Sequence, residues 1–385
     1  MNFLVDNKNK MLKYNYSKFD KIILFLYSSY FVLFPYYFWD SGLPQLSDLI
    51  IVLALIIYLL NGKFKLYLFI KVKPFLFTGL LFISYVIFSN LVWTIIVDNP
   101  GKMWIVPAYY IFNFIVCVFT ISLYAEYGKK FLKIIYKAII ISTLCQLIML
   151  ITSGGFTGGR MTLSFNNPNQ LGYYALLTSS ILIFLSDKVE IKGLWFLIAL
   201  ISNLLLIIAS LSSTAIVSYM GLMLLYIFSK TENKKIKRKT IFFLIILLLA
   251  IFVIHKVTDV FKNHKAIYGL RTRASTVERK TENLITDRGY YRITEYPEYW
   301  ILGAGEGAYL ERFGRIMEFH STLGNIQVSY GIIGLILFLK FLYLALKNNK
   351  FRDWYILFCI LIYGITHNGI RNSLFWIFLA LLVSF

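Results

Sequence analysis

The chain has 385 residues, of which 58% are hydrophobic, 18% aromatic and only 15% charged. A water-soluble chain of this length needs roughly a quarter of its residues charged to cover its surface. The composition therefore excludes an ordinary soluble protein and predicts an all-α polytopic membrane protein. The formal charge of +20 must be located along the chain before it indicates a partner.

Apolar runs separated by polar turns predict about twelve membrane-spanning helices, since one such helix needs about 20 mostly apolar residues. The runs are 20–38, 46–60, 74–97, 103–124, 131–152, 170–186, 193–211, 212–229, 241–256, 321–346, 353–366 and 373–385. The last two are short and are also compatible with one broken helix, so we expect ten to twelve spans. The sequence shows no internal repeat, and we treat residues 1–385 as a single integral membrane domain.

Lysine alternates along the turns between these runs. Lysines cluster before the first run, in every second turn after it, and again around 230–239 and 347–352. Because positive charge marks cytoplasmic loops, we expect a cytoplasmic N-terminus and one long extracytoplasmic segment over 257–320 that carries part of the active site. This placement assigns most of the positive charge to membrane lipids of the inner leaflet, which argues against a nucleic-acid partner.

Arginine has the opposite distribution. Nine of the eleven arginines fall on the expected outer side: Arg160, Arg271, Arg273, Arg279, Arg288, Arg292, Arg312, Arg315 and Arg371. Guanidinium is a planar fork of donors that pairs bidentately with phosphate, so this bias suggests a phosphate-bearing ligand at the outer membrane face. The alternative is a solvated network in which these arginines pair with acidic residues of the same segment.

The first outer loop of interest covers residues 154–174. Asn167 suits the N-cap of a helix and Pro168 its first turn, so a helix is expected to begin at the outer surface. The N–H groups at that helix start would favour an anion, and Arg160 precedes the cap by seven residues. The alternative is that Asn167, Pro168 and Asn169 only cap a transmembrane helix.

The second outer loop, 286–330, contains a glycine-rich stretch and a histidine. Gly303, Gly305 and Gly307 allow the backbone to turn and to approach a ligand closely, although the stretch lacks the strand context of a dinucleotide fingerprint. His320 stands where the outer segment re-enters the membrane, and a helix N-terminus there would keep its imidazole neutral and available as a base. The alternative is that His320 only caps that helix.

His367 is the main rival to His320. It stands in the turn 366–372 together with Asn368 and Arg371, whereas the remaining histidines, at 255 and 264, have no partners nearby in the sequence. We therefore keep His367 and Arg371 as secondary candidates for the site.

At these residues the chain resembles the bacterial O-antigen polymerase and O-antigen ligase family of integral membrane enzymes. The ligase branch has a histidine, then Asn, Ser or Gln, nine residues, a glycine, two residues, and a small residue or tyrosine. His320, Ser321, Gly331 and Gly334 fit that spacing in full. An arginine followed by Asn-Pro-Asn, here at 167–169, and a Gly-x-Gly-x-Gly stretch are further features that this family tends to show.

The resemblance implies an inverting glycosyl transfer at the extracytoplasmic face of the bacterial cytoplasmic membrane, in a GT-C-like fold. An acceptor sugar hydroxyl would attack the anomeric carbon of a glycan linked to undecaprenyl diphosphate, which leaves. The implied site comprises catalytic His320, diphosphate-binding Arg160 and Arg288, Arg292 as the alternative to Arg288, and supporting Asn167, Asn169, Gly303, Gly305, Gly307 and Glu306.

No metal or cofactor is expected for this reaction, and the chain contains no Asp-x-Asp sequence. Arginines and a helix N-terminus can stabilise the charge of a leaving diphosphate instead. The implied partners are the lipid-linked glycan donor and acceptor, membrane lipids, and the chain-length regulator and flippase of the same pathway.

Several other functions compete with a glycan polymerase. An O-antigen ligase uses the same donor with another acceptor, but many family members carry an arginine where this chain has Ser212, Ser213 and Thr214, which favours the polymerase. A different GT-C transferase would use an outer carboxylate such as Asp40 or Asp48. A flippase for lipid-linked oligosaccharide would place charges within its helices, where this chain has almost none, and an accessory protein would not require these ordered motifs.

Overall fold

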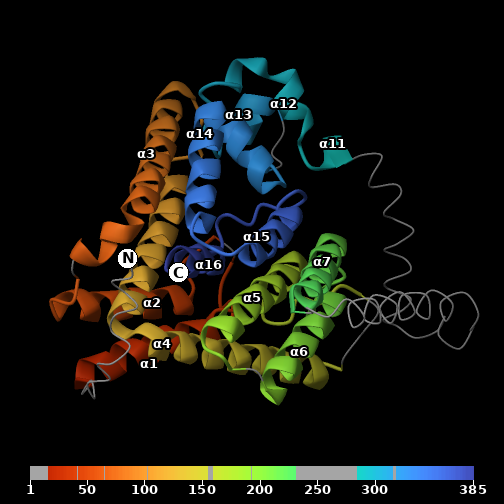
Figure 1. Cartoon of the computed structure of the whole chain (residues 1–385). Coiled ribbons are helices and arrows are strands. Elements are labelled where there is room, and N and C mark those ends of the chain that lie inside the picture. Colours follow the sequence, from red (N-terminus) through yellow and green to blue (C-terminus); the bar gives the residue numbers. More distant parts are fainter. Residues whose placement is uncertain are drawn as a thin grey trace, which may run out of the picture.

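The computed structural model describes residues 16–40, 42–64, 66–101, 103–154, 159–191, 193–230, 284–314 and 318–385. Every regular element within these ranges is a helix (Figure 1). The helix expected over 241–256 and residues 257–283 of the long outer segment lie outside the described residues.

Fifteen helical elements are described, with η marking a short 3-10 helix. They are α1 (Lys18–Leu33), α2 (Leu46–Leu60), η2 (Leu66–Val72), α3 (Lys73–Ile96), α4 (Val106–Thr152), α5 (Pro168–Lys188), α6 (Leu194–Ser210), α7 (Ser213–Lys230), α11 (Leu284–Asp287), α12 (Tyr291–Glu295), η3 (Pro297–Tyr299), α13 (Tyr309–Phe313), α14 (Thr322–Leu346), α15 (Phe351–Tyr363) and α16 (Ser373–Val383). The predicted runs 46–60, 170–186 and 193–211 agree with α2, α5 and α6 to within two residues.

Three of the described helices are long and apolar enough to cross a membrane: Phe69–Ile96, Val106–Thr152 and Thr322–Leu346. Five shorter apolar helices accompany them, namely Leu46–Leu60, Leu194–Ser210, Ser213–Ser229, Asp353–Tyr363 and Ser373–Val383. Large apolar side chains on their outer faces, such as Phe88 and Ile95, are more than half exposed. This combination is typical of helices that lipid covers.

The structure differs from one expected boundary and decides another that the sequence left open. The runs 103–124 and 131–152 belong to one element, α4, which Gly128 divides at φ 54° and ψ −137°. Glycine tolerates this conformation because it has no Cβ, so the chain bends without a separate loop. The last two runs are two helices, α15 and α16, because residues 364–372 form a turn between them.

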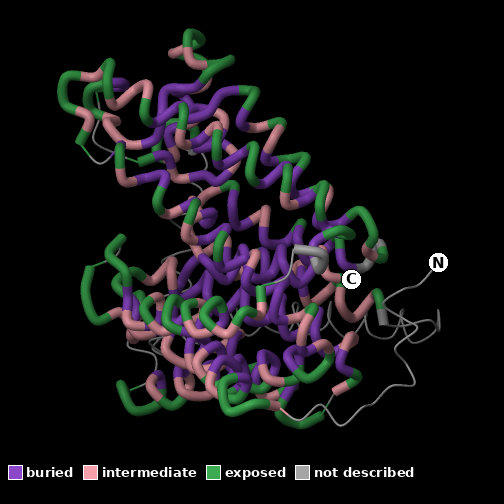
Figure 2. The backbone as a smooth tube through the Cα atoms, turned by 90° about the vertical axis from the view of Figure 1, so that its left-hand side faces the viewer, coloured by how far each residue is buried: buried purple, intermediate pink, exposed green. Residues whose placement is uncertain are grey.

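Helices distant in the sequence pack around a buried centre. α3 packs against α14, α1 against α2 and α4, α7 against α15, and α4 against α6 and α16. Figure 1 shows α3 and α14 upright side by side, with the short helices α12 and α13 near the upper end of α14. Figure 2 shows that buried residues run through the middle of the molecule, and α5 and α16 are buried along most of their length.

The turns rich in lysine lie together at one end of the helices, which we call the lysine end (residues near 17–20, 61–64, 124–130, 187–191 and 347–353). Asp20 forms an ion pair with Lys63 and accepts a hydrogen bond from the Tyr127 hydroxyl at 2.6 Å. Lys188 lies 3.8 Å from the buried carboxylate of Asp353. The turns expected on one side of the membrane therefore contact one another.

The turns expected on the other side form the opposite group, which we call the arginine end (described residues near 35–40, 42–45, 97–101, 103–105, 159–169, 209–214, 284–314, 318–321 and 364–372). The Tyr37 backbone N–H donates to the Ser164 carbonyl at 3.0 Å, and the Asn166 amide donates to the Trp39 carbonyl at 3.0 Å. The Tyr290 hydroxyl donates to the Ile365 carbonyl at 2.6 Å. Every candidate site residue belongs to this end.

Candidate functional site

The start of α5 positions the first arginine of the site. Asn167 is the N-cap, as expected, and its side chain accepts a hydrogen bond from the Asn169 backbone N–H at 2.8 Å. Arg160 donates through one nitrogen to the Asn169 side-chain oxygen and through Nε to the Ser210 carbonyl at 3.1 Å. Because Ser210 ends α6, the guanidinium is held between two helix termini.

Tyr363, at the end of α15, lies among the predicted cationic residues. Its hydroxyl donates to the Asn169 carbonyl at 2.9 Å, and the positive charges of Arg160 and Arg288 both act on it. The His367 ring stacks on Tyr363 with a centroid distance of 4.6 Å. Residues from the α5 start, the outer segment and the turn 364–372 therefore form one group.

His320 lies directly before α14 and does not cap it. The N-cap is Ser321, whose side-chain oxygen accepts from the Gly324 backbone N–H at 3.2 Å. The His320 backbone N–H donates to the Arg288 carbonyl at 3.2 Å, which joins the histidine to the second arginine. Burial, and then the positive charges of Arg288 and Arg292, hold the pKa of His320 below its ordinary value of 6.5 against the opposing charge of Glu318, which favours the neutral ring at pH 7.

The turn 364–372 is fastened to the same helix start. The Thr322 backbone N–H donates to the Gly364 carbonyl at 2.7 Å, and the Thr322 hydroxyl donates to the His367 carbonyl at 3.1 Å. On the other side, the Tyr290 hydroxyl lies 2.9 Å from the Ser321 hydroxyl oxygen. His367 is therefore bonded to Thr322, and His320 directly precedes Ser321 in the chain. Both candidate histidines thus lie at the start of α14.

Arg292 has surroundings unlike those of Arg288. Its side chain is 1% exposed, and its guanidinium lies over the rings of Tyr291, Tyr309 and Phe313 at 5.6, 5.5 and 4.9 Å from their centroids. Contacts with aromatic faces stabilise a buried cation. Arg288 is half-buried and acts on both His320 and Tyr363, so the geometry favours Arg288 of the two.

The three glycines of the outer segment approach the protein's own chain. Gly303, Gly305 and Gly307 have φ values of 81°, 69° and 135°, which favour glycine. A Cβ on Gly303 would lie 2.3 Å from the Ser329 carbonyl oxygen, and one on Gly307 would lie 2.6 Å from the Met103 side chain. We expected these glycines to approach a ligand closely. In the structure they approach α14 and the turn before α4 instead.

This approach exploits a break in α14 at Gly331, where φ is 62°. The Ala304 and Gly305 backbone N–H groups donate at 2.8 Å to the carbonyls of Val328 and Ser329, just before the break. The backbone N–H of residue 332 donates to the carbonyl of residue 300 at 2.7 Å. The outer segment therefore satisfies backbone groups that a straight helix would pair internally, and it fixes the direction of the α14 start.

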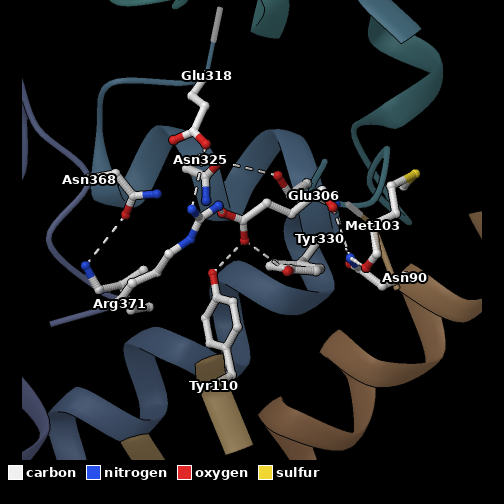
Figure 3. Close-up of polar contacts among 11 residues, drawn as sticks. Asn90, Met103, Tyr110, Glu306, Glu318, Asn325, Tyr330, Asn368 and Arg371 are labelled. Carbon is white, nitrogen blue, oxygen red and sulfur yellow. Dashed lines mark hydrogen bonds and ion pairs between the residues drawn. The ribbon is translucent and has the colours of Figure 1, made fainter. Parts of the chain in front are cut away.

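Glu306 anchors the outer segment inside the molecule (Figure 3). Its carboxylate is fully buried, accepts hydrogen bonds from the Tyr110 and Tyr330 hydroxyls at 2.7 and 3.0 Å, and pairs with Arg371. Its backbone N–H donates to the Asn90 side-chain oxygen at 3.2 Å. Burial alone would raise the pKa of Glu306, but the Arg371 charge and the donors hold it below its ordinary value.

Arg371 differs from Arg160, Arg288 and Arg292 because it pairs with two carboxylates. One nitrogen pairs with Glu306 and another lies 3.6 Å from Glu318, as Figure 3 shows. The negative charges, above all that of Glu306, raise the pKa of Arg371 well above its ordinary value against the opposing effect of burial. Arg371 therefore neutralises protein charges, and its place in the structure is that of an anchor.

Sequence reasoning missed Tyr363 and the Glu306 network. Tyr363 ends an apolar run and resembles an ordinary interfacial tyrosine. The sequence did give a signal for Asn90, because a polar side chain inside an apolar run is costly without a hydrogen-bond partner. Asp48, the carboxylate of the competing GT-C interpretation, lies in the first turn of α2 and accepts a hydrogen bond from the backbone N–H of the N-cap residue Gln45 at 2.9 Å.

The described residues thus bring together two guanidinium groups and a neutral imidazole at the end of an apolar helical bundle. Such a group can bind a diphosphate and accept a proton beside it. Within the described ranges, no cluster of three or more His, Cys, Asp or Glu residues could hold a metal ion. Comparison of the chain with protein-family models gave no matching family, and comparison with curated protein sequences gave no match.

Proposed function

We propose that the chain is a glycan polymerase that uses a glycan linked to undecaprenyl diphosphate as its donor. The observation that carries the proposal is the group at the arginine end. Arg160 and Tyr363 both bond to Asn169 there, and the His320 backbone bonds to the Arg288 carbonyl. A lipid-linked diphosphate requires this combination, because its anion needs fixed cations while its prenyl chain needs an apolar surface.

The reaction proceeds in one displacement. His320 accepts the proton of the acceptor hydroxyl as that oxygen forms a bond to the anomeric carbon of the donor. The bond from this carbon to the phosphate oxygen breaks, and its electron pair leaves with the diphosphate. Arg160 and Arg288 stabilise the developing negative charge, and attack opposite the leaving group inverts the anomeric configuration.

The proposal includes a membrane topology. Ten to twelve spans, a cytoplasmic lysine end and an extracytoplasmic arginine end would place the site where lipid-linked repeat units of O-antigen, capsule or exopolysaccharide are assembled. The apolar helices and the segregation of lysine turns from arginine turns support this arrangement. The GT-C-like fold and the bacterial cytoplasmic membrane are parts of the same proposal.

Polymerase is favoured over ligase by the position that departs from the resembled family. Thr214 lies beside the turn of His367, since its hydroxyl is 2.6 Å from that of Thr366. The arginine that many members of the resembled family carry in this stretch would therefore lie at the same end of the molecule. This chain has small neutral residues there instead. The two enzymes differ in their acceptor, so the products of the reaction separate them.

Substitution of the two arginines tests the proposal. Arg160→Ala and Arg288→Ala should each lower turnover of lipid-linked repeat units on the order of 10²-fold, because a charge-assisted contact to the leaving group is lost. Lysine should rescue poorly at either position, since it lacks the planar fork. Arg352→Ala, predicted at the opposite end, is the matched control. Wild-type turnover in both Arg160→Ala and Arg288→Ala would contradict the proposal.

A further inference from the structure

Thr366 links α7 to the His367 imidazole. Its hydroxyl oxygen lies 2.6 Å from the Thr214 hydroxyl and 2.8 Å from Nδ1 of His367. These three side chains come from two elements, the first turn of α7 and the turn 364–372, and they form a chain of hydrogen bonds that ends on one nitrogen of the imidazole.

The direction of this chain follows from the protons that its members carry. Each threonine has one hydroxyl proton. If Thr214 donates to Thr366 and Thr366 donates to Nδ1, both protons are used. If Nδ1 donated instead, Thr366 would donate to Thr214, and the Thr214 proton would be left without an acceptor among the described residues. The first direction is therefore favoured, and it leaves the proton of a neutral His367 on Nε2.

The ring is held on its other sides as well. It stacks on Tyr363 at an interplanar angle of 15°, and Tyr363 in turn stacks on Tyr173 with a centroid distance of 4.4 Å. The stacking and the hydrogen bond at Nδ1 together fix the orientation of the His367 ring and therefore the direction of its donor at Nε2.

We propose that His367 donates a hydrogen bond from Nε2 to the diphosphate of the lipid-linked glycan, and that Thr214 and Thr366 hold it in the tautomer that can do so. The inference rests on the proposed function and adds a neutral donor to the two arginines. It assigns the two histidines of the arginine end to different tasks, with His320 accepting a proton and His367 binding the leaving group.

Binding of undecaprenyl diphosphate to the purified full-length chain tests this role, with undecaprenol as the matched probe that lacks the diphosphate. His367→Asn removes the donor at Nε2 and should weaken undecaprenyl diphosphate binding about tenfold or more, the usual loss for a hydrogen bond to a charged group. His367→Gln places an amide N–H near Nε2 and should bind within about threefold of wild type. Undecaprenol binding should be unchanged in both variants.

The supporting hydroxyl is tested in the same assay. Thr366→Val removes the group that fixes the tautomer and should weaken undecaprenyl diphosphate binding, whereas Thr366→Ser retains the hydroxyl and should not. Wild-type binding by His367→Asn, equal losses in His367→Asn and His367→Gln, or an equal loss of undecaprenol affinity would each overturn the inference.

The arginine variants distinguish failure of this inference from failure of the proposed function. If Arg160→Ala and Arg288→Ala weaken undecaprenyl diphosphate binding and His367→Asn does not, only the role of His367 is wrong. If neither arginine variant weakens it, the diphosphate site itself is wrong.

Discussion

His320 and Ser321 are neighbours with separate tasks, because Ser321 caps α14 and leaves the imidazole to other partners. A substitution of His320 should therefore leave the helix start intact. His320→Asn should elute like wild type in size-exclusion chromatography and bind the lipid-linked donor, but its turnover should fall by at least about 10²-fold for loss of the base.

His367→Asn is the comparison for this prediction. It should retain measurable turnover at saturating donor, since its proposed loss is in binding. Normal elongation by His320→Asn together with an inactive His367→Asn would show that the base is in the turn 364–372 and is not His320.

The lowered pKa of His320 predicts the pH dependence of turnover. A base must be unprotonated, so activity should be constant near neutrality and should be lost as the pH falls through a pKa below 6.5. Arg288 contributes to the lowering, and Arg288→Gln should therefore shift the acid limb of its residual activity to higher pH. A wild-type inflection above 6.5, or an inflection that Arg288→Gln leaves in place, would be incompatible with this role.

At the scale of elements, the break in α14 determines how the outer segment meets the bundle. A Cβ on Gly331 would lie 2.1 Å from the Ile301 carbonyl oxygen, and the φ of 62° adds strain for any other residue. Gly331→Ala should therefore destabilise the protein by at least about 1–3 kcal/mol, measured as a lower temperature of aggregation in detergent.

Gly193 supplies the control for this substitution. Its added Cβ would meet nothing within 4 Å, and its backbone is extended. Gly193→Ala should therefore aggregate at the wild-type temperature, and equal stability of the two variants would mean that the break carries no strain.

Some elements could be predicted from the sequence because their determinants are local. The start of α5 is specified by Asn167 and Pro168 within a few residues, and the apolar runs fix most helix positions. The role of the glycine-rich stretch could not be read in this way. Gly303 needs its conformation because Ser329 lies against it, and that contact exists only after α14 has folded.

The same distinction applies to the candidate site. Arg160 and His320 carried recognisable sequence patterns, so both were predicted. Tyr363 had no such pattern, and its importance comes from neighbours that are distant in the sequence, such as Asn169. Glu306 was predicted only as a supporting residue, since its partners Tyr110 and Arg371 lie on other elements.

At the scale of the whole molecule, the separation of the lysine end from the arginine end predicts which residues are accessible from outside the cell. In a variant without the native cysteines, Asn166→Cys and Glu298→Cys should react with an impermeant maleimide in intact cells. Lys129→Cys and Lys347→Cys should react only after the membrane is opened, because the proposed topology places the lysine end on the cytoplasmic face. Labelling of both groups in intact cells would contradict both the proposed topology and the proposed site.

The most direct test of the proposed function is the reaction of the purified wild-type protein with native lipid-linked repeat units. Glycan length and released undecaprenyl diphosphate should be measured in the same reaction, with and without EDTA. We predict that the glycans lengthen, that one undecaprenyl diphosphate is released for each new linkage, and that EDTA changes neither quantity. Unchanged glycan length under these conditions, or lengthening that EDTA abolishes, would contradict a metal-independent glycan polymerase.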